Sequence, residues 1–175
     1  YQGAYKVSRE LLQEFGDTIR VITQENRGLA AARNLGISRA SGDHVAWLDA
    51  DDLAEPQRFE IQSGVLDRYR ELILVHSEFT AFGTEITNSA MPYSSTYYPV
   101  LRNDGTRHPF YDHELPACDS HDHVLPAVLH GKVTAALIRG NFVHPPTIMM
   151  RRADFEKIGQ LDESMQSGCD YDFIL

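Results

Sequence analysis

The hydrophobic positions between residues 7 and 82 follow two alternating patterns. In one, apolar residues recur every three or four positions, as Val7, Leu11 and Phe15 do before Gly16, which is typical of a helix with a glycine stop. In the other, short apolar runs rich in β-branched residues indicate strands. The patterns predict helices over 7–15, 29–40 and 56–69, and strands over 19–23, 44–48 and 72–79. This alternation is typical of an α/β protein whose mostly parallel sheet carries helices on both faces.

The rest of the chain divides into an irregular part and a regular part. Residues 83–123 are rich in Gly, Pro, Ser, Tyr and His without a sustained period, which favours a long functional loop with room for short strands. Regular spacing then resumes. It predicts a helix over 125–137, a strand over 147–150, a helix over 152–158 that Gly159 ends, and a last helix over 169–175.

Composition narrows the class of protein. The 175 residues are 42% hydrophobic and 23% charged, which is enough apolar material for the core of one domain. No apolar run approaches the roughly 20 residues of a membrane span. The net charge of −9 disfavours binding to nucleic acid, because a polyanion is repelled by an acidic surface. Two cysteines, Cys118 and Cys169, cannot build a disulfide scaffold, so a reducing compartment such as the cytoplasm is expected.

Three carboxylates directly follow the strand predicted over 44–48. Asp49, Asp51 and Asp52 fall within four positions, and ligands of open α/β sheets bind outside the carboxyl ends of strands. Crowded carboxylates repel one another unless a cation neutralises them, and a hard ion such as Mg²⁺ or Mn²⁺ suits oxygen ligands. The alternative is a solvated acidic turn in which Asp52 caps the next helix. Spacing alone leaves both interpretations open.

Four ordered segments resemble the family 2 glycosyltransferases of the GT-A fold, whose sheet is Rossmann-like. Residues 26–36 match N-x-G-x-x-x-A-R-N-x-G, and residues 49–51 match the D-x-D motif. Residues 152–163 are similar to the family's R-x-x-F-x-x-x-G-x-[FL]-D-E segment, and residues 169–172 fall where its E-D-x-D motif stands. The resemblance covers about 7–80 and 125–175, whereas 83–123 matches no segment of the family.

The resemblance implies a metal-dependent transfer of a sugar, with inversion, from a nucleotide-diphosphate sugar to a hydroxyl of a glycan, lipid or other acceptor. It implies Asp170 as the catalytic base and Mn²⁺ or Mg²⁺ as the cofactor. The implied metal ligands are Asp49, Asp51 and Asp52. The implied donor-binding residues are Asn26, Gly28, Arg33, Asn34, Asp49 and Asp51. For three of these residues a structural interpretation stays open: a surface arginine for Arg33, a buried cap for Asn34 and a helix cap for Asp170.

Two departures from the family pattern shape the expected organisation. Cys169 replaces the usual Glu of E-D-x-D, and the family's first strand, helix and second strand have no counterpart. We therefore expect a single, incomplete GT-A domain over 1–175, which need not be active alone. Its expected parts are a donor and metal part over 7–82, the loop over 83–123 and an acceptor part over 124–175. Segments outside the chain would provide any peripheral association with the inner face of a membrane.

Alternative functions and residues stay open. A non-catalytic nucleotide-sugar or carbohydrate-binding domain could keep this fold, whereas a nucleotidyltransferase is disfavoured because no Gly-rich phosphate loop is visible. His144 precedes a predicted strand and could face the acceptor. Loop aromatics could stack on a sugar or pack locally: Tyr93, Tyr97, Tyr98, Phe110 and Tyr111. Exposed loop histidines are favoured over a zinc site at His108, His113, Cys118, Asp119, His121 and His123.

Overall fold

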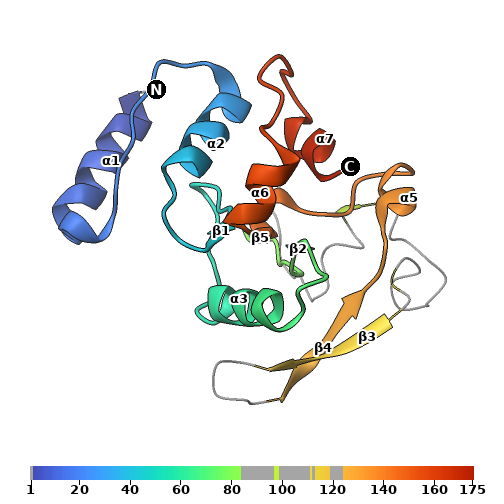
Figure 1. Cartoon of the computed structure of the whole chain (residues 1–175). Coiled ribbons are helices and arrows are strands. Elements are labelled where there is room, and N and C mark those ends of the chain that lie inside the picture. Colours follow the sequence, from blue (N-terminus) through green and yellow to red (C-terminus); the bar gives the residue numbers. More distant parts are fainter. Residues whose placement is uncertain (1, 84–96, 99–110, 112, 119–123) are drawn as a thin grey trace.

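The structure of the chain is a computed structural model that describes residues 2–83, 97–98, 111, 113–118 and 124–175 (Figure 1). The described helices are α1 (Gln2–Phe15), η1 (Gly16–Thr18), α2 (Gly28–Arg39), α3 (Arg58–Arg68), α5 (Thr134–Leu137), η3 (Pro145–Thr147), α6 (Arg152–Ile158) and α7 (Cys169–Ile174). The described strands are β1 (His44–Ala46), β2 (Leu74–Val75), β3 (His113–Cys118), β4 (Val124–His130) and β5 (Met149–Arg151). None of the described helices is long and apolar enough to span a bilayer.

Local chemistry explains where the best-defined helices begin and end. At the start of α2, the Asn26 side chain accepts a hydrogen bond from the Gly28 amide at 3.1 Å. This bond satisfies a helix N-terminal donor that has no partner within the helix. Helix α6 ends at Gly159, whose φ of 109° is unfavourable for a residue that carries a Cβ. The predicted helices over 7–15, 29–40 and 152–158 are thereby confirmed to within a few residues.

The sheet differs from the predicted parallel arrangement. Strand β5 lies between β1 and β2 and pairs antiparallel with both, with Val45 opposite Met150 and Val75 opposite Met149. Strands β1 and β2 run in the same direction but never pair with each other, because a strand from late in the chain separates them. The expectation of a mostly parallel sheet is therefore wrong for the described strands, although the mixture of helices and sheet is confirmed.

Two further elements differ from the predictions. The run over 19–23 forms no strand, and its Val21 and Ile22 are 37% and 40% exposed. Its β-branched composition favours a strand, but no described strand pairs with it. The helix predicted over 125–137 is wrong over most of its length. Strand β4 occupies its first part and pairs antiparallel with β3, and helix is limited to α5. The antiparallel pairing with β3, which helical spacing within 125–137 does not reveal, accounts for this outcome.

The core joins the sheet to the C-terminal helices. In Figure 1 the three-stranded sheet lies at the centre, with α3 on one side and α2, α6 and α7 on the other. Trp47, just after β1, lies 6.0 Å from the ring centroids of both Phe155 and Phe173. Those two rings stack on each other at 5.2 Å and come from α6 and α7. This aromatic contact fixes the end of β1 against the helix that carries Asp170.

Candidate functional site

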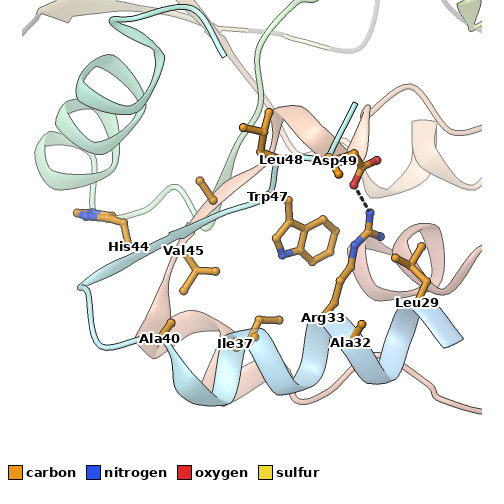
Figure 2. A pocket seen from close by; sticks show the side chains of 13 residues that line it. Leu29, Ala32, Arg33, Ile37, Ala40, His44, Val45, Trp47, Leu48 and Asp49 are labelled. Carbon is orange, nitrogen blue, oxygen red and sulfur yellow. Dashed lines mark hydrogen bonds and ion pairs between the residues drawn. The ribbon is translucent and has the colours of Figure 1, made fainter. Parts of the chain in front are cut away.

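A cavity opens between α2 and β1 (Figure 2). Its volume is about 540 Å³, and its wall is mostly apolar, with Arg33, His44 and Asp49 as the polar lining side chains. The lining side chains that Figure 2 labels come from α2 and from the strand and its continuation: Leu29, Ala32, Arg33, Ile37, Ala40, His44, Val45, Trp47, Leu48 and Asp49. Asp49, the first aspartate of the turn, thus lies at the margin of a concave surface, where a ligand could approach it.

Arg33 connects the two acidic parts of the site. Its guanidinium donates to an Asp49 carboxylate oxygen at 3.3 Å and to an Asp170 carboxylate oxygen at 3.5 Å. The same group lies 4.5 Å from the centroid of the Trp47 ring, in cation–π geometry. Its side chain is only 10% exposed, so the indole and both carboxylates hold it in place. The structure therefore brings together three of the residues that the sequence singled out, from α2, the turn after β1, and α7.

The acidic cluster has the form of a turn after β1. The Asp52 amide donates to the Asp49 carbonyl at 3.1 Å, which closes the turn. The Asp49 side chain is 45% exposed, and Asp51 is an exposed residue, so both carboxylates can reach a ligand. Among the described residues, no group of three or more His, Cys, Asp and Glu side chains is arranged to hold a metal ion. This donor set suits an ion held by one or two carboxylates and completed by substrate phosphates, not a full protein cage.

Asp170 lies in the first turn of α7, and its side chain is 22% exposed. One of its oxygens accepts the backbone amide of Tyr171 at 2.9 Å, and the other faces Arg33. The N-cap of α7 is Gly168, without a side-chain capping bond, so the interpretation of Asp170 as the helix cap is wrong, and its role as a base stays a prediction. Cys169, which stands in place of the family's Glu, is 3% exposed and belongs to the hydrophobic core. A charged side chain at that depth would be costly, so cysteine suits this packing.

Asn34 points away from the carboxylates. Its amide nitrogen donates to the Leu161 carbonyl at 2.9 Å and to Glu163 at 3.1 Å, and its oxygen accepts the Leu161 amide at 2.9 Å. Arg27 adds an ion pair with Glu163 at 2.6 Å. These contacts favour the structural interpretation of Asn34 as a buried clamp. Asn26, just before α2, accepts a hydrogen bond from the amide of Gly28, the first residue of that helix.

Two features near the carboxylates are hard to predict from the sequence. Arg58 of α3 donates to the carbonyl of Trp47 at 3.0 Å and to the side chain of Gln62 at 3.1 Å. It thereby supports the strand end that carries the aspartates. Burial lowers the pKa of Arg58, and nearby Asp52 opposes that shift. Spacing gave no signal for this residue, because its partners are backbone and side-chain groups brought together by folding.

The second unpredicted feature is the pairing of His144 with Tyr98. The Tyr98 hydroxyl lies 3.0 Å from His144 Nδ1. Burial lowers the pKa of His144, while Asp52, Asp49 and Asp170 act in the opposite direction. His144 therefore lies within electrostatic reach of Asp49, Asp52 and Asp170. This placement agrees with the expectation that His144 faces the acceptor side of the site. The role of His144 in acceptor binding stays a prediction.

Of the other candidate residues in the loop over 83–123, the structure describes the side chain of Tyr111. Tyr111 packs locally: its hydroxyl lies 2.6 Å from His76 Nε2 and its ring is edge-on to Phe142. Burial raises its pKa, and so does nearby Glu78. The remaining loop candidates lie outside the described residues or side chains: Tyr93, His108, Phe110, His113, Cys118, Asp119, His121 and His123.

A mixed α/β fold with an aspartate turn after a strand, facing a helical aspartate, indicates a protein of the glycosyltransferase class. The chain belongs to glycosyl transferase family 2, because the profile of that family matches residues 3–116, well over half of its length. The matched range contains α2 and the turn with Asp49, Asp51 and Asp52, whereas Asp170 lies beyond it.

Individual relatives agree with the family assignment. The chain is 33% identical over 94 residues to EpsE of Bacillus subtilis, a protein named as a putative glycosyltransferase. The aligned region covers 50% of this chain and 34% of EpsE. It is 35% identical over 81 residues to the glycosyltransferase GlyA of Streptococcus pneumoniae, covering 45% and 12% of the two chains. An uncharacterized glycosyltransferase of Rickettsia conorii is 26% identical over 160 residues, or 90% of this chain and 22% of its own. The matches span about a third or less of the length of each of these three relatives.

Proposed function

We propose that this chain forms part of an enzyme that transfers a sugar from a nucleotide-diphosphate sugar to an acceptor hydroxyl, with inversion and with help from a divalent metal. The observation that carries the proposal is the pair of contacts from Arg33 to Asp49 and Asp170. Two carboxylates that are remote in sequence thus meet at one guanidinium beside a cavity. Family membership supports the same reaction class.

The roles follow from where each group lies. Asp170 is the proposed base, because inversion requires a base on the face of the sugar opposite the leaving diphosphate. Asp49 and Asp51 are the proposed ligands of the donor and the ion, with Asp52 beside them. The positive charge of Arg33 offsets the negative charges of Asp49 and Asp170. Its guanidinium can also direct an N–H group toward an anionic ligand. Trp47 keeps that guanidinium in place through the 4.5 Å stacking contact.

A bound Mg²⁺ or Mn²⁺ would neutralise charge that develops on the leaving diphosphate. The exposed carboxylate of Asp51 and the partly exposed one of Asp49 would hold it, with phosphate oxygens as further ligands. The ion would compete with Arg33 for the Asp49 oxygen that accepts the Arg33 hydrogen bond. We therefore infer that ligand binding redistributes the Arg33 contacts between Asp49 and Asp170.

Two aspartate variants test the metal and the base separately in the full-length protein. Thermal shifts are measured with UDP-, GDP- and dTDP-sugars in Mn²⁺ and in EDTA. Asp51→Ala should abolish the metal-dependent shift, whereas Asp170→Asn should keep it and reduce turnover by a factor of about 10² or more. Asp17→Asn, at an exposed aspartate in η1, is the control and should change neither quantity. Equal donor affinity with and without EDTA would refute the metal role, and normal turnover of Asp170→Asn would refute the base.

A further inference from the structure

Four rings gather beside the carboxylates and form what we call the aromatic wall: Phe79, Tyr97, Tyr98 and His144. The His144 ring stacks face to face on Phe79, with centroids 4.1 Å apart and planes 16° apart. Tyr97 is edge-on to Tyr98 at 4.9 Å and to His144 at 5.6 Å. Ring pairs at these separations stabilise one another, so the wall is a packed unit.

The wall is buried on one side and accessible on the other. Tyr98 is 8% exposed, and its hydroxyl is held by the contact with His144. Tyr97 is 56% exposed, although it is a large aromatic residue within a packed group of rings. A rigid backing that presents one exposed ring with polar groups next to it is the surface that a sugar needs. The C–H face of a pyranose can cover the ring while its hydroxyls reach a hydroxyl or imidazole.

Electrostatics connect the wall to the proposed reaction centre. Asp170 raises the pKa of Tyr98, after the larger effects of burial and of Tyr97, and it acts on His144 as well. Burial keeps the imidazole toward its neutral form by lowering the pKa of His144. A neutral imidazole has one N–H donor and one acceptor nitrogen, which suits a hydroxyl group. Tyr98 also belongs to the same buried cluster as Cys169, the residue before Asp170, so the wall lies close to the proposed base and offers neutral hydrogen-bonding groups.

The charge of the surroundings selects among acceptors. Asp49, Asp52 and Asp170 all act on His144, and Arg33 is the cation that contacts two of these three carboxylates. Arg58 lies near Asp52, so these three carboxylates face two guanidinium groups and the site keeps a net negative charge. A phosphate or carboxylate on the acceptor would be repelled here, whereas an uncharged ring with hydroxyl groups would not.

We propose that the aromatic wall is the acceptor subsite and takes an uncharged sugar ring, which lies on Tyr97 and presents a hydroxyl toward Asp170. This inference rests on the proposed glycosyl transfer for its functional meaning. Its physical content, a Tyr97-dependent site for neutral pyranosides, does not require that any donor binds.

Saturation-transfer NMR on the full-length protein tests the wall directly. The neutral probes are methyl β-glucoside, methyl β-galactoside and N-acetylglucosamine, and glucuronate and glucose 6-phosphate are the charged probes. At least one neutral probe should bind, and the charged probes should bind more weakly. Tyr97→Ala should weaken that binding about fivefold or more, whereas Tyr97→Phe should retain it, because the ring supplies the contact. Phe15→Ala, at an aromatic residue of α1 that is 46% exposed, is the matched control.

The outcomes separate this inference from the proposed function. Binding of neutral sugars that Tyr97→Ala weakens supports the wall, even if no nucleotide-sugar binds, and would then favour a non-catalytic carbohydrate-binding domain. Donor binding without any Tyr97-dependent sugar signal overturns the wall and leaves the transfer reaction standing. Preferential binding of the charged probes also overturns it. Tyr98→Phe adds an independent check, since it keeps the ring and deletes the hydrogen bond to His144; we expect weaker binding of the neutral probe.

Discussion

Replacing Asn34 by alanine should destabilise the fold strongly, because Asn34 is the described partner of two buried backbone groups. Leu161 is 2% exposed, and both its amide and its carbonyl bond to the Asn34 side chain at 2.9 Å. Asn34→Ala leaves this donor and this acceptor unsatisfied. Each such group costs about 1–3 kcal/mol, so the free energy of unfolding should fall by about 2–6 kcal/mol.

Urea denaturation of the wild type and the variant measures this difference. Ser38→Ala is the control on the same helix, since it deletes an exposed hydroxyl that donates to the Leu35 carbonyl at 2.8 Å. That change should stay within about 0.5 kcal/mol. A free energy of unfolding for Asn34→Ala within the same margin would refute the clamp. If nucleotide-sugar binding were lost at unchanged stability, Asn34 would be a donor ligand instead.

Two further predictions concern glycine and acid. Gly159→Ala should lower the free energy of unfolding by about 1 kcal/mol or more, because φ is 109°. Gly36→Ala within α2 should raise it by about 0.5–1 kcal/mol, because no atom beyond the neighbouring helix backbone lies within 4 Å of the added Cβ. Thermal melts compare the two variants with the wild type. Burial alone would raise the pKa of Asp154, but hydrogen bonds from Lys157 and Arg151 lower it overall. That stabilisation exists above the usual pKa of an aspartate and is lost as pH falls through the lowered value. The destabilisation by Asp154→Asn should therefore be large at neutral pH and shrink in urea titrations at pH values below the usual aspartate pKa. A difference that does not depend on pH would contradict this reasoning.

Helices were predictable wherever the local sequence decides them. The range 152–158 coincides with α6, and 29–40 differs from α2 by one residue at each end. Both contain good helix formers, and a glycine opens α2 or follows α6. The aspartate turn after β1 was equally predictable, because three acidic residues directly after an apolar run cannot continue a buried strand and favour a turn.

Strand partners were not predictable, because pairing depends on segments remote in sequence. The alternation of strands and helices suggested parallel neighbours, but β5 pairs antiparallel with β1 and β2. The strand predicted over 72–79 is limited to β2, which has β5 as its described partner. The pairing of His144 with Tyr98 is similarly a product of folding, since 46 positions separate the two residues.

Consecutive residues of α2 carry out separate tasks at the site. Neighbouring positions on a helix point about 100° apart, so Arg33 and Asn34 face different partners. Arg33 contacts the carboxylates of Asp49 and Asp170 directly, and Asn34 holds the Leu161 segment, which leads into α7. One turn of α2 therefore holds Asp170 in two ways: Arg33 contacts the Asp170 carboxylate, and Asn34 holds the segment that precedes α7. Because the two acidic motifs meet across this turn, a shift of α2 would change the distance between Asp49 and Asp170 without any change in either aspartate.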